Sequence, residues 1–136
     1  MADFWTSKTN MPLPARYTLA ASTIGTDKGY VYGGYGAGYL QDCDEYSQSG
    51  NSWISKANLP APARKALAAS TIGTDKGYVY GGYSGSYLQD CDEYSQSGNS
   101  WISKANMPSP ARARLAASTI GTDKGYVYAG YGYGCH

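Results

Sequence analysis

Few side chains in this 136-residue chain could do chemistry on a bound molecule. His136 is the one histidine and follows Cys135, and these two ligands are too few for a closed metal site. Carboxylates recur at Asp42, Asp44 and Glu45, but on an extended strand one of the three points away from the other two. We therefore expect a solvated acidic stripe, no metal site, no cofactor and no enzymatic activity.

A second set of residues combines cationic side chains with tyrosines. Guanidinium groups bind carboxylates and phosphates, and tyrosine rings stack on sugars or cations, so the set suits an acidic or phosphorylated peptide, or a glycan. For the repeated arginines, the alternative is a structural ion pair with strand carboxylates such as Asp44 and Glu45. The candidate ligand-binding residues are Arg16, Tyr17, Tyr35, Tyr39, Arg64, Lys65, Tyr83, Tyr87, Arg112, Arg114, Tyr131 and Tyr133.

The sequence repeats itself at a constant interval. Trp5, Trp53 and Trp101 are evenly spaced along the chain and mark that interval. The segment Tyr39–Asn58 recurs letter for letter as Tyr87–Asn106, and the sequence ASTIGTDKGYVY occurs three times with the same spacing. A period of about 50 residues indicates a repeat architecture, in which neighbouring units bury each other's apolar faces.

Each repeat contains four short segments with strand character. In the unit that begins at Arg64, the runs LAASTI and YVYGGY are rich in small, β-branched and aromatic residues, and LQDCDEY alternates with a period of two. Turn sequences separate these runs, and Pro108 and Pro110 interrupt the ladder before the next unit. We therefore predict an all-β fold with four antiparallel strands per unit, at residues 67–72, 78–83, 88–94 and 101–104.

Four features of the unit resemble the kelch repeat. They are the glycine pair Gly81 and Gly82, then Tyr94, then Trp101, and a Pro-x-Pro-x-Arg sequence before the next copy. The resemblance covers essentially the whole chain, although the third copy reads Tyr-Ala-Gly at residues 128–130. It implies a β-propeller whose four-stranded blades have strands a to d running outwards from the central axis. It implies no particular chemistry, because propellers host many functions.

This pattern predicts just under three blades. The predicted boundaries are 16–63 for the first blade, 64–111 for the second, 112–136 for an incomplete third blade with strands a and b, and 1–15 for a linker and a d strand, Trp5 to Lys8, donated to close a blade. The missing c strand leaves two alternatives. Either the third blade is frayed and shortened, or its slot accepts a strand from another molecule.

Such an arc would expose an apolar flank at each end. Kelch-like propellers usually have six or seven blades, so the resemblance implies that further subunits complete the ring. A homodimer with six blades is the simplest closure, and a ring of three chains or an open filament are the alternatives. The residues expected at the closure are Phe4, Trp5, Tyr126 and Tyr128.

The overall composition argues against several classes of partner. With 11 basic and 10 acidic residues the net charge is +1, which leaves no electrostatic footprint for nucleic acid or an anionic membrane. No apolar run approaches the roughly 18 residues of a membrane span, and the first residues lack the features of a signal peptide. Cys43 and Cys91 occupy equivalent positions in neighbouring units and are expected to be free thiols, so we expect a cytoplasmic protein.

The repeats differ mainly in the d–a connection and the b–c loop, for example at Tyr17, Lys65 and Ala113. Because strands alternate in direction, both loops should emerge on one side of the propeller, and the invariant a–b and c–d turns on the other. We interpret the varied side as the ligand surface of a binding or scaffold module, with drift in solvated loops as the alternative. Two further hypotheses are a glycan-binding, lectin-like propeller and an engineered or recently duplicated fragment whose only function is assembly.

Overall fold

The computed structural model describes residues 4–132, and over that range every regular element is a β-strand, as the sequence predicts. The strands form three antiparallel sheets of four, four and two strands. The first sheet has the order β1 (Ala20–Ile24), β2 (Lys28–Tyr32), β3 (Cys43–Ser47) and β4 (Ser52–Ser55). The second has β5 (Ala68–Ile72), β6 (Lys76–Tyr80), β7 (Cys91–Ser95) and β8 (Ser100–Ser103), and the third has β9 (Ala116–Ile120) and β10 (Lys124–Tyr128).

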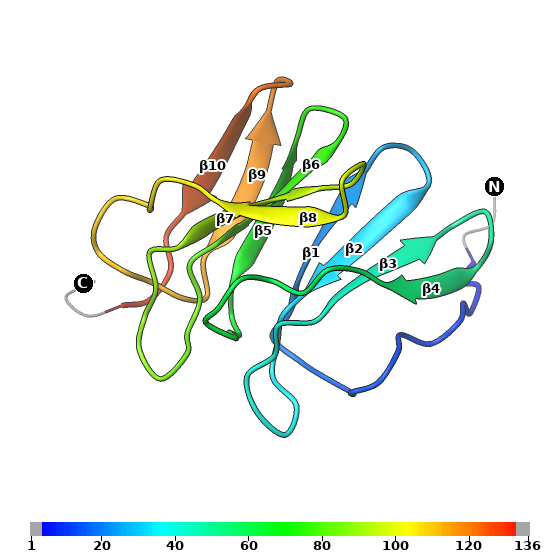
Figure 1. The fold of residues 1–136 in the computed structure, drawn as a ribbon, viewed down its shortest axis with the longest axis horizontal. Coiled ribbons are helices and arrows are strands. Elements are labelled where there is room, and N and C mark those ends of the chain that lie inside the picture. The colour runs from blue at the N-terminus through cyan, green and yellow to red at the C-terminus, as the bar shows by residue number, and fades with distance from the viewer. Residues whose placement is uncertain (1–3, 133–136) are drawn as a thin grey trace.

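The three sheets stand side by side as consecutive blades of a partial propeller (Figure 1). Their first strands, β1, β5 and β9, lie next to one another, and the later strands of each sheet follow outwards. The a–b turns emerge at the top of Figure 1 and the b–c loops at the bottom. Backbone bridges join the d–a connections to the b–c loops, Tyr17 to Tyr35 and Lys65 to Tyr83. The prediction that these two kinds of loop share one side is confirmed.

The second and third predicted strands differ most from the structure. The strand predicted at 78–83 ends at Tyr80, because Gly81 and Gly82 have φ angles of +57° and +112°, which a regular strand does not accommodate. The third strand, predicted at 88–94, begins later, at the start of β7. The glycine pair therefore marks the end of the b strand and lies outside it.

The d strand predicted at Trp5 to Lys8 does not form in the single chain. Residues 4–12 adopt no strand. A d strand is held by hydrogen bonds to the c strand of its blade, and no described segment offers a c strand to these residues. As a result, the side chains of Phe4 and Trp5 are exposed to solvent.

The invariant turns are fixed by their own hydrogen bonds. The carboxylate of Asp27, in the first a–b turn, accepts hydrogen bonds from Ser47 Oγ at 2.9 Å and from the backbone amide of Ser49 at 2.7 Å. The hydrogen bond with Lys28, followed by those from Ser49, holds the pKa of Asp27 well below its usual range. Asp75 makes the same contacts in the second sheet. Because these turn residues are needed for structure, their invariance is no evidence that the opposite side varies in order to bind.

Neighbouring blades interlock through a tyrosine that lies over a glycine. The Tyr32 ring meets Trp101 edge to face with centroids 5.7 Å apart, and the Tyr30 ring packs on Tyr94 at 5.5 Å. Glycine is required at Gly77, because a Cβ atom there would lie 2.5 Å from the Tyr32 hydroxyl. The three tyrosines are buried, so this contact lies in the main hydrophobic core, which spans the first two blades.

The substitution Gly77→Ala is expected to lower the free energy of unfolding by about 1–3 kcal/mol, because the added methyl overpacks a filled contact. Gly38→Ala is the control, since no heavy atom lies within 4 Å of a Cβ atom added there. Urea denaturation followed by tryptophan fluorescence measures both. A Gly77→Ala loss no larger than that of Gly38→Ala would show that this contact does not set the spacing between blades.

Candidate binding face and exposed flanks

The repeated arginines lie inside the blades. Arg64 is fully buried, and its Nη2 donates a hydrogen bond to Asp92 Oδ2. Arg16 makes the same charge-assisted hydrogen bond to Asp44, and its side chain is also completely enclosed. The prediction that these two arginines face a ligand is therefore wrong. The alternative, an ion pair with a strand carboxylate, describes both of them, because a buried guanidinium needs a buried counter-charge.

The carboxylates of the c strand are also buried, so the expected solvated acidic stripe is wrong. Asp44 accepts a further hydrogen bond from Ser55 Oγ at 2.8 Å. Glu45 accepts a hydrogen bond from the Tyr30 hydroxyl and lies 3.4 Å from Lys56 Nζ. Burial, followed by the hydrogen bond to Glu45, raises the pKa of Tyr30. Each of these two carboxylates is paired with a cation and a hydroxyl group, so both have a structural role inside the blade.

Arg112 differs from the other two repeated arginines. In the first two blades, the repeated arginine pairs with a carboxylate on the c strand, Asp44 or Asp92. The described part of the third blade has no c strand that could supply the equivalent carboxylate. As in Arg16 and Arg64, the Nε atom of Arg112 is buried and has no hydrogen-bond partner among the described residues. Arg112 therefore belongs to the interior of the third blade, and its predicted role on the binding face is not supported.

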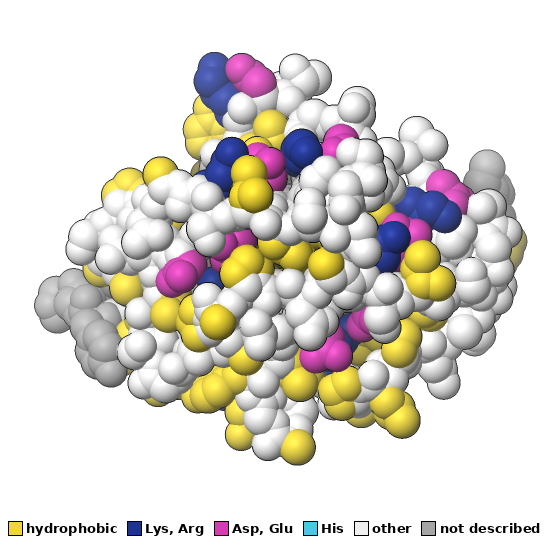
Figure 2. Space-filling model, in the orientation of Figure 1, with side chains coloured by type: hydrophobic (Ala, Val, Ile, Leu, Met, Phe, Trp, Pro, Cys, Tyr) yellow, Lys and Arg dark blue, Asp and Glu magenta, His cyan; other side chains and the backbone are white. Residues whose placement is uncertain are grey.

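The predicted tyrosines do come together. Six of them form a continuous chain of edge-to-face contacts across all three blades, with ring centroids 5.2–6.1 Å apart. We call this set the tyrosine arc; its members are Tyr17, Tyr35, Tyr39, Tyr83, Tyr87 and Tyr131. Figure 2 shows hydrophobic side chains, a class that includes tyrosine, gathered along the lower edge of the molecule, where the b–c loops lie. Tyr133, the remaining predicted tyrosine, is outside the described residues.

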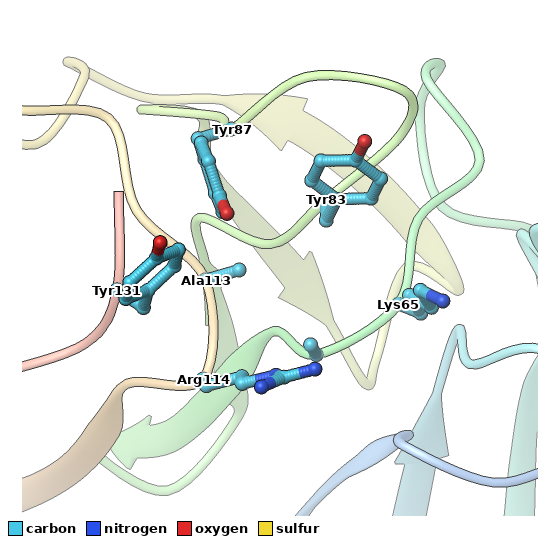
Figure 3. A pocket seen from close by; sticks show the side chains of 7 residues that line it. Lys65, Tyr83, Tyr87, Ala113, Arg114 and Tyr131 are labelled. Carbon is cyan, nitrogen blue, oxygen red and sulfur yellow. The ribbon is translucent and has the colours of Figure 1, made fainter. Parts of the chain in front are cut away.

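A pocket of about 360 Å³ opens between the second and third blades on this side (Figure 3). The d–a connections contribute Lys65, Ala66, Ala113 and Arg114, and the b–c side contributes Tyr83, Tyr87 and Tyr131. Figure 3 shows the tyrosine rings grouped above the cationic side chains. The lining therefore combines two positive charges with three aromatic rings and contains no carboxylate.

Lys65 and Arg114 are positioned by the backbone of the d–a connections. Lys65 Nζ lies 4.5 Å from the centroid of the Tyr35 ring, within the range of a cation–π contact. Arg114 has a φ angle of +55°, and Thr18 and Ala66 share this left-handed geometry at the equivalent positions. The turn is thus the same in each repeat while its side chain varies, so the charge at this position can differ from blade to blade.

The third blade presents an uncovered row of apolar side chains. Ile120 and Tyr128 are 56% and 45% exposed, whereas the equivalent residues of the first blade, Ile24 and Tyr32, are 0% exposed. We call this row the end ridge; it consists of Ile120, Tyr126 and Tyr128. Two of the four predicted closure residues, Tyr126 and Tyr128, belong to it.

The first blade has a matching hollow on its opposite flank. A cavity of about 310 Å³ lies there, and its lining includes Gly29, Val31, Tyr46 and Trp53. We call these four residues the flank socket. Sequence reasoning missed it, although a signal was available: Gly29, Tyr46 and Trp53 lie exactly one repeat before Gly77, Tyr94 and Trp101, which receive the tyrosines of the preceding blade.

Comparison with known proteins adds no assignment: no protein-family model matches the chain, and a search of curated proteins found no significant match. Within residues 4–132, no helix could span a membrane, and no group of three or more His, Cys, Asp and Glu side chains could hold a metal ion. Cys135 and His136 lie outside the described residues.

The described cysteines are free and protonated. Cys43 is buried and Cys91 half-buried, and neither forms a disulfide. Burial, followed by the nearby Asp44 carboxylate, raises the pKa of Cys43 to about 12, and burial likewise raises that of Cys91 to about 11. Because the thiolate is the nucleophile, both cysteines are unreactive at neutral pH.

The substitution Arg64→Ala is expected to lower the free energy of unfolding by about 3–5 kcal/mol, because it leaves the carboxylate of Asp92 buried without its cation. The neighbouring Lys65→Ala should cost less than about 1 kcal/mol, since it removes only a partly exposed cation–π contact. Chemical denaturation of the two variants checks the difference. Equal losses would contradict the assignment of Arg64 to the interior and Lys65 to the binding face.

Proposed function

We propose that the chain is a non-enzymatic binding module of the propeller type, whose tyrosine-lined side takes a ligand with a negatively charged group. The observation that carries this proposal is the pocket between the second and third blades, whose lining combines Lys65 and Arg114 with three tyrosines and contains no carboxylate. Such a site attracts an anion and offers flat apolar surface beside it.

Binding is a better explanation of this site than catalysis. The carboxylates that could act as acid or base, Asp44 and Glu45, are buried in ion pairs within the blade. The thiols of Cys43 and Cys91 are held protonated. The pocket itself contains no described nucleophile paired with a base, and its chemistry is limited to charge, hydroxyl groups and aromatic faces.

Two ligand classes fit the same chemistry. An acidic or phosphorylated peptide would place its anionic group between the two cations, and an acidic glycan would in addition stack a sugar ring on a tyrosine. The extent of the tyrosine arc across three blades favours an extended ligand over a small ion. The resemblance to kelch repeats supports a ligand surface built from these loops.

The test uses an array of acidic peptides, phosphopeptides and neutral and acidic oligosaccharides, followed by titration calorimetry with the best probe. We expect acidic probes to bind better than their neutral counterparts, and Lys65→Ala or Arg114→Ala to weaken binding about 10-fold, as for one charge-assisted hydrogen bond. Tyr83→Ala should have its largest effect on ligands that stack a ring on a tyrosine.

Lys124→Ala is the control, because it removes the same charge from the exposed first residue of β10, beside the a–b turn of the third blade and on the other side of the molecule. Binding should also weaken as salt rises, since exposed charges are screened. Preference for neutral probes, or equal effects of Lys124→Ala and Arg114→Ala, would refute an anion-binding pocket.

A further inference from the structure

The two exposed flanks of the chain are the two halves of an interface that the chain already contains. Between the first and second blades, Tyr30 packs on Tyr94, and Tyr32 packs on Trp101. The Tyr32 hydroxyl and the Ile24 side chain lie directly over the space left by Gly77. Every residue of this contact has an equivalent one repeat away in the sequence.

The contact between the second and third blades repeats part of this arrangement. There the Tyr80 hydroxyl and the Ile72 side chain lie over Gly125. A glycine on the b strand of one blade thus receives the tyrosine and isoleucine of the blade before it, at two successive junctions. The geometry is therefore a property of the repeat and not of one pair of blades.

At the ends of the chain the same residues lack their counterparts. Gly29 holds the position of Gly77 and Gly125, yet no heavy atom lies within 4 Å of a Cβ atom built on it. Tyr128 holds the position of Tyr32 and Tyr80, yet it is exposed. One flank has a socket without a ridge, and the other has a ridge without a socket.

We propose that the end ridge of one copy of this chain inserts into the flank socket of a second copy. Following the internal template, Tyr126 packs on Tyr46 of the second copy, and Tyr128 packs on its Trp53. The Tyr128 hydroxyl and Ile120 then lie over Gly29 of the second copy. This proposal does not depend on the proposed ligand-binding function.

The hydrogen bonds between neighbouring blades also recur at equivalent positions of the repeat. The amide of Ala66 donates to Thr18 O, and the amide of Arg114 donates to Ala66 O, both at 2.7 Å. The hydroxyl of Thr71 donates to Thr23 O, and that of Thr119 donates to Thr71 O. In the assembly, the backbone amide of Thr18 of the second copy donates to Arg114 O. The hydroxyl of Thr23 of the second copy donates to Thr119 O.

The N-terminal segment is already placed for this arrangement. Trp101 Nε1 donates to Ala57 O at 2.8 Å, where the chain leaves the first blade for the second. Trp53 Nε1 donates in the same way to Thr9 O at 3.0 Å, so Thr9 lies where the exit from a preceding blade would lie. The exposed Phe4 and Trp5 precede Thr9 and correspond in the repeat to the d strand of that preceding blade, whose other strands the second copy supplies.

Contacts of this kind join unlike surfaces, so they form either a closed ring or an open filament. Two copies related by a two-fold axis contain two identical junctions and leave no flank uncovered. Their blades number six, which is the smaller of the ring sizes implied by the resemblance to kelch propellers. The proposed assembly is therefore a ring of two chains.

The experiment measures mass in solution by sedimentation equilibrium on the full chain and three variants. The unmodified chain should have twice the 14.5 kDa mass of one chain at micromolar concentration. Gly29→Leu fills the socket, and Tyr128→Ser shortens the ridge, so each should weaken association roughly 30-fold or more, as for a central interface residue. Tyr131→Ser is the matched control, because Tyr131 is an exposed tyrosine that belongs to the other surface.

Mixing the two interface variants tests the head-to-tail arrangement. A mixed pair of Gly29→Leu and Tyr128→Ser has one junction with both changes and one junction with neither, so the mixture should associate more tightly than either variant alone. Circular dichroism identifies any variant that fails to fold, and Val31→Arg, also in the socket, then replaces Gly29→Leu.

Three results would overturn the proposal: an unmodified chain that stays monomeric at 100 μM, association that neither interface variant weakens, and a mixture that associates no better than its components. Assemblies larger than two chains would overturn the two-chain ring.

Discussion

The distance between one tyrosine hydroxyl and one glycine determines how closely the blades of this protein can stand. At Gly77 and Gly125 a side chain of any size would collide with the tyrosine of the preceding blade. The absence of a side chain lets the tyrosine ring reach across the junction and bury itself against the next sheet. Because every repeat carries the same residues at these positions, the same restriction applies at each junction, and the angle between successive blades is set by repetition of one contact.

Within each of the first two blades, a second interaction supports the first. The buried guanidinium of Arg64 is paired with Asp92 on the c strand, and Gly82 N donates to the backbone carbonyl of the next arginine, Arg112, at 3.0 Å. The repeated arginine thus links the start of its blade to the preceding blade through its backbone carbonyl. Where a c strand is present, its side chain also links that start to the c strand through an ion pair. The cost of burying the charge is offset by the carboxylate, so the pair stabilises the fold, and the more exposed Lys65 and Arg114 are the cations of the proposed ligand site.

Much of the fold could be predicted from the sequence, because repetition shows what a single segment cannot. The even spacing of the tryptophans predicted the number of blades, and the loop tyrosines came together because equivalent loop positions converge in a propeller. The prediction that Asp44 and Glu45 are solvated was wrong. Period-two alternation shows which side of a strand a residue faces, but it does not show which distant arginine or lysine packs against that side. The repeat does show that Gly29 is equivalent to Gly77, but it does not show which surface packs on either glycine. Only the three-dimensional comparison shows that the space over Gly77 is filled and the space over Gly29 is open.

The central claim is that the outer blades of one chain are completed by another copy. The most direct test is the thermal unfolding midpoint of the unmodified chain measured from 1 to 200 μM. Association that stabilises only the folded state makes the midpoint rise with concentration, and this is the result the account predicts. A sharp, reversible transition at the same temperature across that range would contradict it, because it would show that a single chain is stable with both flanks uncovered.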